Sequence, residues 1–156
     1  MASSLPLFPR FVFTIFEPIS LLGGFLGPFL APAFFVSSQV ATSPEEAHDL
    51  LPSEHVLALQ LGNAYLLLGF LGLFILNTTD ELKTVKAYLA ALWLGDIGHI
   101  AVTAWAMGWD GVADVGSWTA VAWGNIAVTA GLFAVRSLYF LGCFGEGSSV
   151  RAKKEL

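Results

Sequence analysis

The stretch that decides the fold runs from Val85 to Met107 and reads VKAYLAALWLGDIGHIAVTAWAM. A helix needs about 20 mostly apolar residues to cross a bilayer, and this stretch is long enough. Three further stretches have the same character, at residues 11–35, 55–76 and 118–141. We therefore predict an all-α fold, a transmembrane four-helix bundle with up-down-up-down topology.

The composition agrees with a membrane protein. Of the 156 residues, 56% are hydrophobic and only 12% are charged, and the mean hydropathy is +0.72. Lipid rather than water must solvate much of such a surface, which argues against a soluble domain. No basic stripe suggests nucleic acid, and the single cysteine excludes an internal disulfide and a CxxC metal site. We expect neither a metal nor a cofactor.

The four stretches form one transmembrane domain over residues 1–156, with a short basic tail at 142–156. The first stretch contains Pro18, Pro28 and Pro32, so we expect its helix to be kinked. Gly108, Asp110, Gly111 and Asp114 follow the third stretch and predict a turn there.

The cations predict an orientation, because cytosolic loops accumulate Lys and Arg. With four spans, the cationic regions all fall on one face: Arg10, then Lys83 and Lys86, then Arg136, Arg151, Lys153 and Lys154. Both termini are therefore predicted to be cytosolic. The final residues, KKEL, resemble a dilysine retrieval signal of the endoplasmic reticulum, and the alternative is a generic basic tail that binds anionic lipid.

Small residues predict where the helices touch. Inside lipid no hydrophobic effect drives helices together, so they associate where small side chains let their backbones pack closely. Ala87, Ala91 and Gly95 recur every four residues and lead to His99, which predicts that this face is packed. The second span carries the same spacing in Ala58 and Gly62.

Polar residues at membrane depth are expensive and therefore mark candidate sites. Asp96 and His99 lie near the middle of the third span and share one face, so this pair is predicted to exchange a proton. Glu17 is a third candidate catalytic group, with pairing near the interface as its alternative. The predicted substrate-binding residues are Gln60, Asn63, Tyr65, Tyr88, Trp93, Trp123 and Asn125. The alternative for the polar residues is hydrogen bonding that only holds the bundle together.

Four short segments resemble those of a known family: LGNAYL (61–66), KAYL (86–89), DIGH (96–99) and WGN (123–125). In order and spacing they resemble a family of small fungal four-span membrane proteins of unassigned function. The chain is also loosely similar to fungal membrane-bound terpene cyclases and to the sterol-isomerase superfamily, which are longer and carry different signatures. The resemblance implies the fold and these positions, and no reaction.

Two functions of different classes follow. The first is a membrane enzyme of the endoplasmic reticulum, in fungal secondary metabolism, that isomerises or cyclises a lipophilic isoprenoid, sterol or polyketide-derived molecule by acid-base chemistry. The alternative is a non-catalytic accessory or scaffold protein; a proton-coupled carrier is disfavoured, because four spans make a narrow pathway. The expected partners are the lipid bilayer and a lipophilic small molecule, and a homodimer or membrane enzyme partners are left open.

Overall fold

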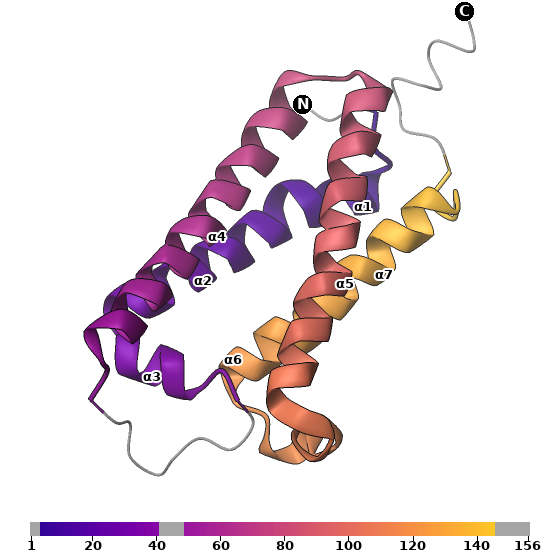
Figure 1. The fold of residues 1–156 in the computed structure, drawn as a ribbon. Helices are drawn as coiled ribbons and strands as arrows, with labels where there is room; N and C mark the ends of the chain where they lie inside the picture. Colours follow the sequence, from indigo (N-terminus) through magenta and orange to yellow (C-terminus); the bar gives the residue numbers. More distant parts are fainter. Residues whose placement is uncertain (1–3, 41–48, 146–156) are drawn as a thin grey trace, which may run out of the picture.

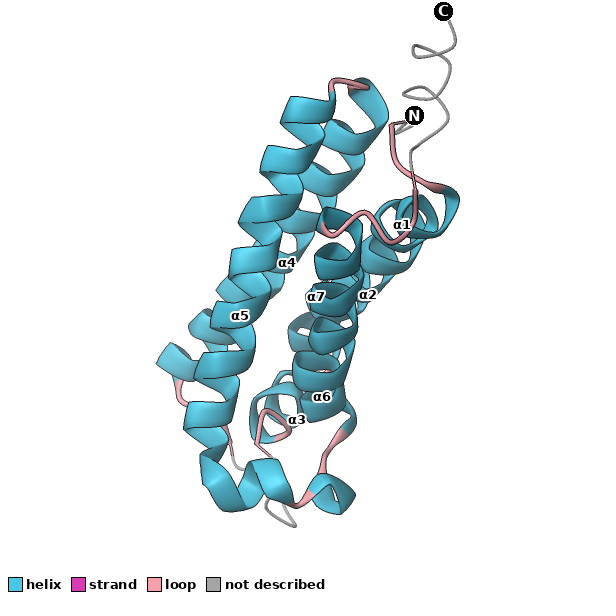
Figure 2. Ribbon diagram, turned by 90° about the vertical axis from the view of Figure 1, so that its right-hand side faces the viewer, coloured by secondary structure: helices cyan, strands magenta, loops and turns pink. Residues whose placement is uncertain are grey.

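The computed structural model of the protein describes residues 4–40 and 49–145. Every regular element in those ranges is helical, as predicted, and loops or tight turns join the helices (Figures 1 and 2). In chain order the elements are α1 (Leu7–Phe11), a π-helical turn (Val12–Phe16), α2 (Glu17–Leu30), α3 (Pro32–Ser37), α4 (Pro52–Thr78), α5 (Leu82–Ala113), a 3-10 turn (Val115–Ser117), α6 (Ala120–Trp123), a second π-helical turn (Gly124–Val128) and α7 (Thr129–Phe140).

Four spans are long and apolar enough to cross a membrane, which confirms that prediction. They cover Leu7–Leu30, Pro52–Thr78, Leu82–Ala113 and Ala120–Phe140. Large apolar side chains on these helices are widely exposed, among them Leu7, Leu57 and Trp105. Such a surface is suited to lipid, and we treat the chain as an integral membrane protein.

The breaks in the spans have local causes. Ala31 leaves helical geometry (φ −147°, ψ 68°) directly before Pro32, whose ring disfavours a helical conformation in the preceding residue. This break lies within the predicted stretch 11–35, so the first span ends at Leu30, earlier than predicted, and α3 forms a separate helix. Gly108 interrupts α5 with a positive φ of 70°, a conformation that glycine adopts readily, and so ends the straight part of the third span.

The spans pack as two pairs, α2 with α4 and α5 with α7 (Figure 1). Small residues allow the first pair to approach closely. A Cβ atom at Gly62 would lie 2.7 Å from Cγ of Pro28, and one at Gly24 would lie 2.8 Å from the ring of Tyr65. Ala58 and Gly62 are both buried, so the prediction that this spacing marks a helix contact is confirmed.

The corresponding prediction for α5 is wrong. Ala87, Ala91 and Gly95 are exposed, and a Cβ atom at Gly95 would meet nothing within 4 Å in the described part of the chain. The face of α5 that packs carries Val85, Leu89 and Asp96 instead. His99, one turn beyond Asp96, is half-buried.

The two pairs meet at both ends of the bundle. We call the end where α1 begins and α7 ends the near end; there the rings of Phe8 and Phe144 lie 5.5 Å apart. An apolar core joins the pairs in the half of the bundle next to this end, formed by Leu5, Val12, Phe13, Leu76, Val85, Leu89 and Leu132.

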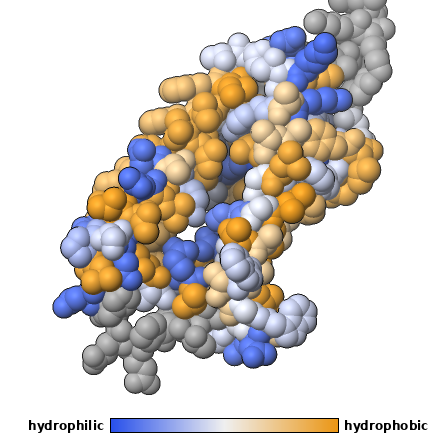
Figure 3. Space-filling view, in the orientation of Figure 1, coloured by the Kyte–Doolittle hydropathy of each residue, from blue (hydrophilic) through white to orange (hydrophobic). Residues whose placement is uncertain are grey.

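At the opposite, far end, α3 reaches across towards α6 (Figure 1). The Thr119 hydroxyl donates to the Ser38 carbonyl over 2.6 Å, and Nδ2 of Asn125 donates to Oε1 of Gln39 over 2.7 Å. Between the apolar core and this contact, an opening separates the pairs, and hydrophilic side chains lie along part of its edge (Figure 3).

Candidate functional site: an ion-paired centre between three spans

Three charged side chains from three spans meet inside the bundle. Arg136 of α7 is completely buried, and its Nη1 donates to Oδ2 of Asp96 on α5 over 2.5 Å. Its Nη2 donates to Oε1 of Glu17 at the start of α2. We call Glu17, Asp96 and Arg136 the ionic centre. It joins two predicted site residues to a third residue that was not predicted.

The helix geometry explains how Arg136 reaches the carboxylates. Arg136 lies one turn before the end of α7, and helical side chains lean towards the N-terminus of their own helix. The guanidinium therefore points into the bundle and away from the near end. The ring of Phe13 lies against it, with the guanidinium carbon 5.2 Å from the ring centroid, a cation–π contact that helps to replace hydration.

Proline shapes the backbone that presents Glu17. Pro18 has no backbone N–H, and its ring crowds the carbonyl four residues earlier, that of Thr14. The chain takes a π-helical turn over Val12–Phe16, directly before Glu17, which relieves this crowding. The Glu17 carbonyl accepts from the Ser20 hydroxyl over 2.8 Å, so this part of α2 has an additional hydrogen bond.

The ionic centre has an uneven charge and an uneven exposure. With both acids ionised, one guanidinium and two carboxylates carry one excess negative charge. The Arg136 side chain is 0% exposed, whereas the Glu17 and Asp96 side chains are 9% and 11% exposed. The accessible part of the centre therefore belongs to the two acidic side chains. Nε of Arg136 is buried and has no hydrogen-bond partner among the described residues.

Two further predicted residues lie next to the ionic centre, both on α5. His99 follows Asp96 by one turn of α5, which places the two side chains on one face of the helix. Tyr88 precedes Asp96 by two turns and packs against the apolar core that contains Phe13. Its hydroxyl would lie 2.8 Å from a Cβ atom at Gly72 on α4. In the described part of the chain, Asp96 is bonded to Arg136 and not to His99.

Trp93 lies beside the ionic centre without joining it. Its indole N–H donates to the Ser137 hydroxyl over 2.9 Å, and its ring stacks on Phe133 at 5.4 Å. Ser137 directly follows Arg136 in the sequence. Trp93 thus fixes α5 against α7 at the level of the ionic centre.

The remaining predicted binding residues lie elsewhere. Asn125 belongs to the far-end contact, and Tyr65 packs against Gly24 within the first helix pair. Gln60, Asn63 and Trp123 are exposed. The structure therefore gathers Glu17, Tyr88, Asp96 and His99 around Arg136 and leaves the other predicted residues outside this group.

Sequence reasoning assigned Arg136 to the cytosolic end of the fourth span, as one of the orienting cations. Arg136 does lie one turn before the end of α7, but its side chain is buried among helices and does not extend to the interface. The sequence did contain a signal that Arg136 pairs with the buried acids. Two acids at membrane depth require a cation, and Arg136 is the sole Lys or Arg in the predicted span 118–141.

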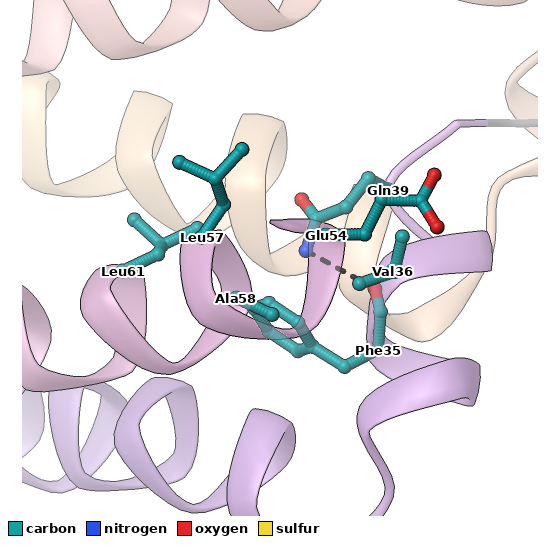
Figure 4. A pocket seen from close by; sticks show the side chains of 7 residues that line it. All are labelled: Phe35, Val36, Gln39, Glu54, Leu57, Ala58 and Leu61. Carbon is teal, nitrogen blue, oxygen red and sulfur yellow. Dashed lines mark hydrogen bonds between the residues drawn. The ribbon is translucent and has the colours of Figure 1, made fainter. Parts of the chain in front are cut away.

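A pocket of about 260 Å³ lies near the far end, between α3 and the start of α4 (Figure 4). Phe35, Leu57, Ala58 and Leu61 line it, and Gln39 and Glu54 are its polar members. These two already bond within the chain: Gln39 donates to the Phe35 carbonyl, and Glu54 accepts from the Leu51 N–H. The pocket therefore offers mainly apolar volume.

Comparison with known proteins gives a family and no activity. No curated protein and no solved structure matches the chain. Within residues 4–40 and 49–145, no three His, Cys, Asp or Glu side chains gather as a metal site would require. A family model does match residues 2–146, nearly the whole chain, and on this basis the protein belongs to the family described as a domain of unknown function, DUF7704.

Proposed function

We propose that this protein is a membrane-embedded enzyme that acts on a lipophilic molecule by acid-base chemistry, with His99 as the proton-transfer group. One observation carries the proposal: a half-buried imidazole lies one helical turn from a carboxylate that Arg136 holds in place. Histidine is the side chain that most often serves as a general acid or base in proteins.

The roles of the two residues differ in this proposal. Asp96 is engaged by Arg136, so its contribution is electrostatic and it acts as a positioning residue. The His99 ring makes no hydrogen bond within the described residues, which leaves it available to a ligand. Glu17 bonds to the same guanidinium and so also acts as a positioning residue. Tyr88 supplies a hydroxyl group near the ionic centre.

The reaction class that suits this arrangement is an isomerisation or cyclisation. His99 would donate a proton to a double bond, and a neighbouring carbon would return a proton to His99 as the new bond forms, so the step balances. The positive charge that develops on the substrate would lie near the excess negative charge of the ionic centre, which stabilises it. Isoprenoids, sterols and polyketide-derived molecules are candidate substrates, because they can react in this way and dissolve in a bilayer.

The opening between the helix pairs supports access from the membrane (Figure 3). Location in the endoplasmic reticulum, with cytosolic termini, remains part of the proposal. The described cations Arg10 and Lys83 both lie towards the near end, in support of that orientation. The KKEL tail lies outside the described residues.

A second candidate, a non-catalytic accessory or scaffold protein, is favoured by a different observation. Arg136 ties α7 to both α2 and α5, as a purely structural ionic clasp would. In that case the polar residues maintain a fixed shape that another membrane protein recognises.

A single comparison separates the two candidates. His99→Ala removes the proton-transfer group and leaves the ionic centre intact, so normal protein abundance with loss of a lipophilic metabolite supports the enzyme. Unchanged metabolites at normal abundance would overturn it. Asp96→Asn is measured in parallel, and equal loss of protein and product in both variants would favour the accessory role.

A further inference from the structure

The ionic centre holds two acids and one cation, so with both acids ionised it carries one uncompensated negative charge. Two carboxylates face one guanidinium, and all three belong to membrane-spanning segments. An unpaired charge in a low-dielectric interior is strongly disfavoured, so a positive group that balances it binds favourably. A proton, a protonated His99 or a cationic ligand are the groups that could supply this charge.

Exposure indicates which side of the centre such a partner would contact. Arg136 is completely covered, by the ring of Phe13 on one face and by its two carboxylates. Glu17 and Asp96 each keep a small accessible fraction. An approaching ligand therefore contacts the acidic side chains and does not contact the guanidinium.

We propose that this protein binds a lipophilic cation, with an ammonium group against Asp96 and Glu17 and an apolar body between the helix pairs. The inference builds on the proposed function and names its ligand class: a membrane-soluble amine, or a substrate that acquires positive charge as it reacts.

The surroundings of the ionic centre fit such a ligand. Phe13, Leu89 and Leu132 belong to the apolar core that adjoins the centre, and the half-buried Trp93 lies at the same level as the centre. The titratable neighbours are Tyr88 and His99, and neither adds negative charge at neutral pH. The carboxylates are thus the recognition element for charge, and the walls of the opening supply hydrophobic contact.

The test measures equilibrium binding of two radiolabelled probes with the same alkyl chain, N,N-dimethyldodecylamine and dodecanol. The full-length protein is embedded in phosphatidylcholine nanodiscs, and binding to empty nanodiscs is subtracted. The amine, which is protonated at neutral pH, should bind at least about tenfold more tightly than the alcohol, because the opposite charges interact in a medium of low dielectric constant. Equal affinities would overturn the inference.

Variants locate the binding. Asp96→Asn removes the excess charge and leaves Glu17 to pair with Arg136, so the affinity for the amine should fall by about tenfold or more while that for dodecanol stays constant. Glu17→Gln should have the same effect and replaces Asp96→Asn in the test if that variant does not fold. Asp110→Asn, an exposed acid near the end of α5, is the matched control and should change nothing. An unchanged affinity in both charge variants would also overturn the inference.

The two proposals fail separately. If the amine and the alcohol bind alike while His99→Ala abolishes a product, the acid-base proposal stands and the cation site is rejected. If the amine binds selectively while His99→Ala leaves all metabolites unchanged, the site binds cations without catalysis.

Discussion

The ionic centre and the far-end contact both connect the two helix pairs, and they do so with opposite chemistry. In the ionic centre, the bond from Arg136 to Glu17 crosses between pairs, whereas the bond to Asp96 stays within one pair. At the far end, neutral groups of Thr119 and Asn125 make the crossing. Neutral contacts can be lost at small cost, whereas a buried charge that loses its partner is strongly destabilising.

The largest effect should come from removing the cation. Arg136→Met leaves Glu17 and Asp96 as two unpaired acids in the membrane interior, and we expect a loss of about 3 to 5 kcal/mol in the free energy of unfolding. Thermal unfolding in nanodiscs and steady-state abundance measure it. Lys83→Met, at an exposed position on α5, is the control for loss of one positive charge. A variant as stable as this control would show that the ionic centre does not hold the bundle.

An uncharged centre should restore most of the lost stability. Combining Arg136→Met with Glu17→Gln and Asp96→Asn removes every charge, and buried ion pairs replaced by uncharged groups are often close to neutral in stability. We expect the triple variant to unfold at a higher temperature than Arg136→Met alone. If it were as unstable as the single variant, the bonds themselves, and not the unpaired charge, would account for the stability.

The same variant sharpens the functional question. An enzyme or a cation-binding protein needs the charges, so the triple variant should fold and yet lose amine binding. An accessory protein needs only the shape, and it should keep its role once the fold is restored. The metabolite profile, measured at equal protein abundance, distinguishes these outcomes: loss of the product supports the enzyme, and retention supports the accessory protein.

At the far end, Thr119 should have an intermediate effect. Its Oγ1 accepts from the Ala122 N–H as the helix cap of α6 and donates to the Ser38 carbonyl, so one hydroxyl serves two elements. Thr119→Val keeps the shape and removes both bonds, and loss of the cap alone is worth about 1 kcal/mol. Thr119→Ser retains the hydroxyl and should unfold like the unaltered protein. Equal stability of the Val and Ser variants would contradict the double role.

Much of the fold follows from local sequence. Hydropathy locates four spans because the requirement for about 20 apolar residues is set by bilayer thickness. The breaks at Pro32 and Gly108 follow from backbone chemistry that a single residue carries. The packing of small residues does not follow in this way. Ala58 with Gly62 and Ala91 with Gly95 have identical spacing, and only the first pair is buried, because burial depends on which helix lies opposite.

The candidate site was also predictable only in part. Asp96 and Glu17 were identified because acids at membrane depth need an explanation. Arg136 was missed because a long cationic side chain near a helix end usually extends outward to the interface, and the sequence alone does not fix its direction. Asn125 was assigned to the site by its depth and by the family resemblance, neither of which shows what it faces. Equal depth does not place residues side by side, and Asn125 faces Gln39 at the far end instead.

The smallest effect should come from Asn125. Asn125→Leu removes the bond to Gln39 and leaves one neutral amide, and hydrogen bonds between membrane helices are worth about 0.6 kcal/mol on average. The expected shift in unfolding temperature is slight, and amine binding at the distant ionic centre should not change. Gln39→Leu, made alone and together with Asn125→Leu, completes a double-mutant cycle that isolates the bond. A coupling as large as the loss in Arg136→Met would erase the contrast between the two ends, because a neutral contact would then hold the helix pairs together as firmly as the ionic centre does.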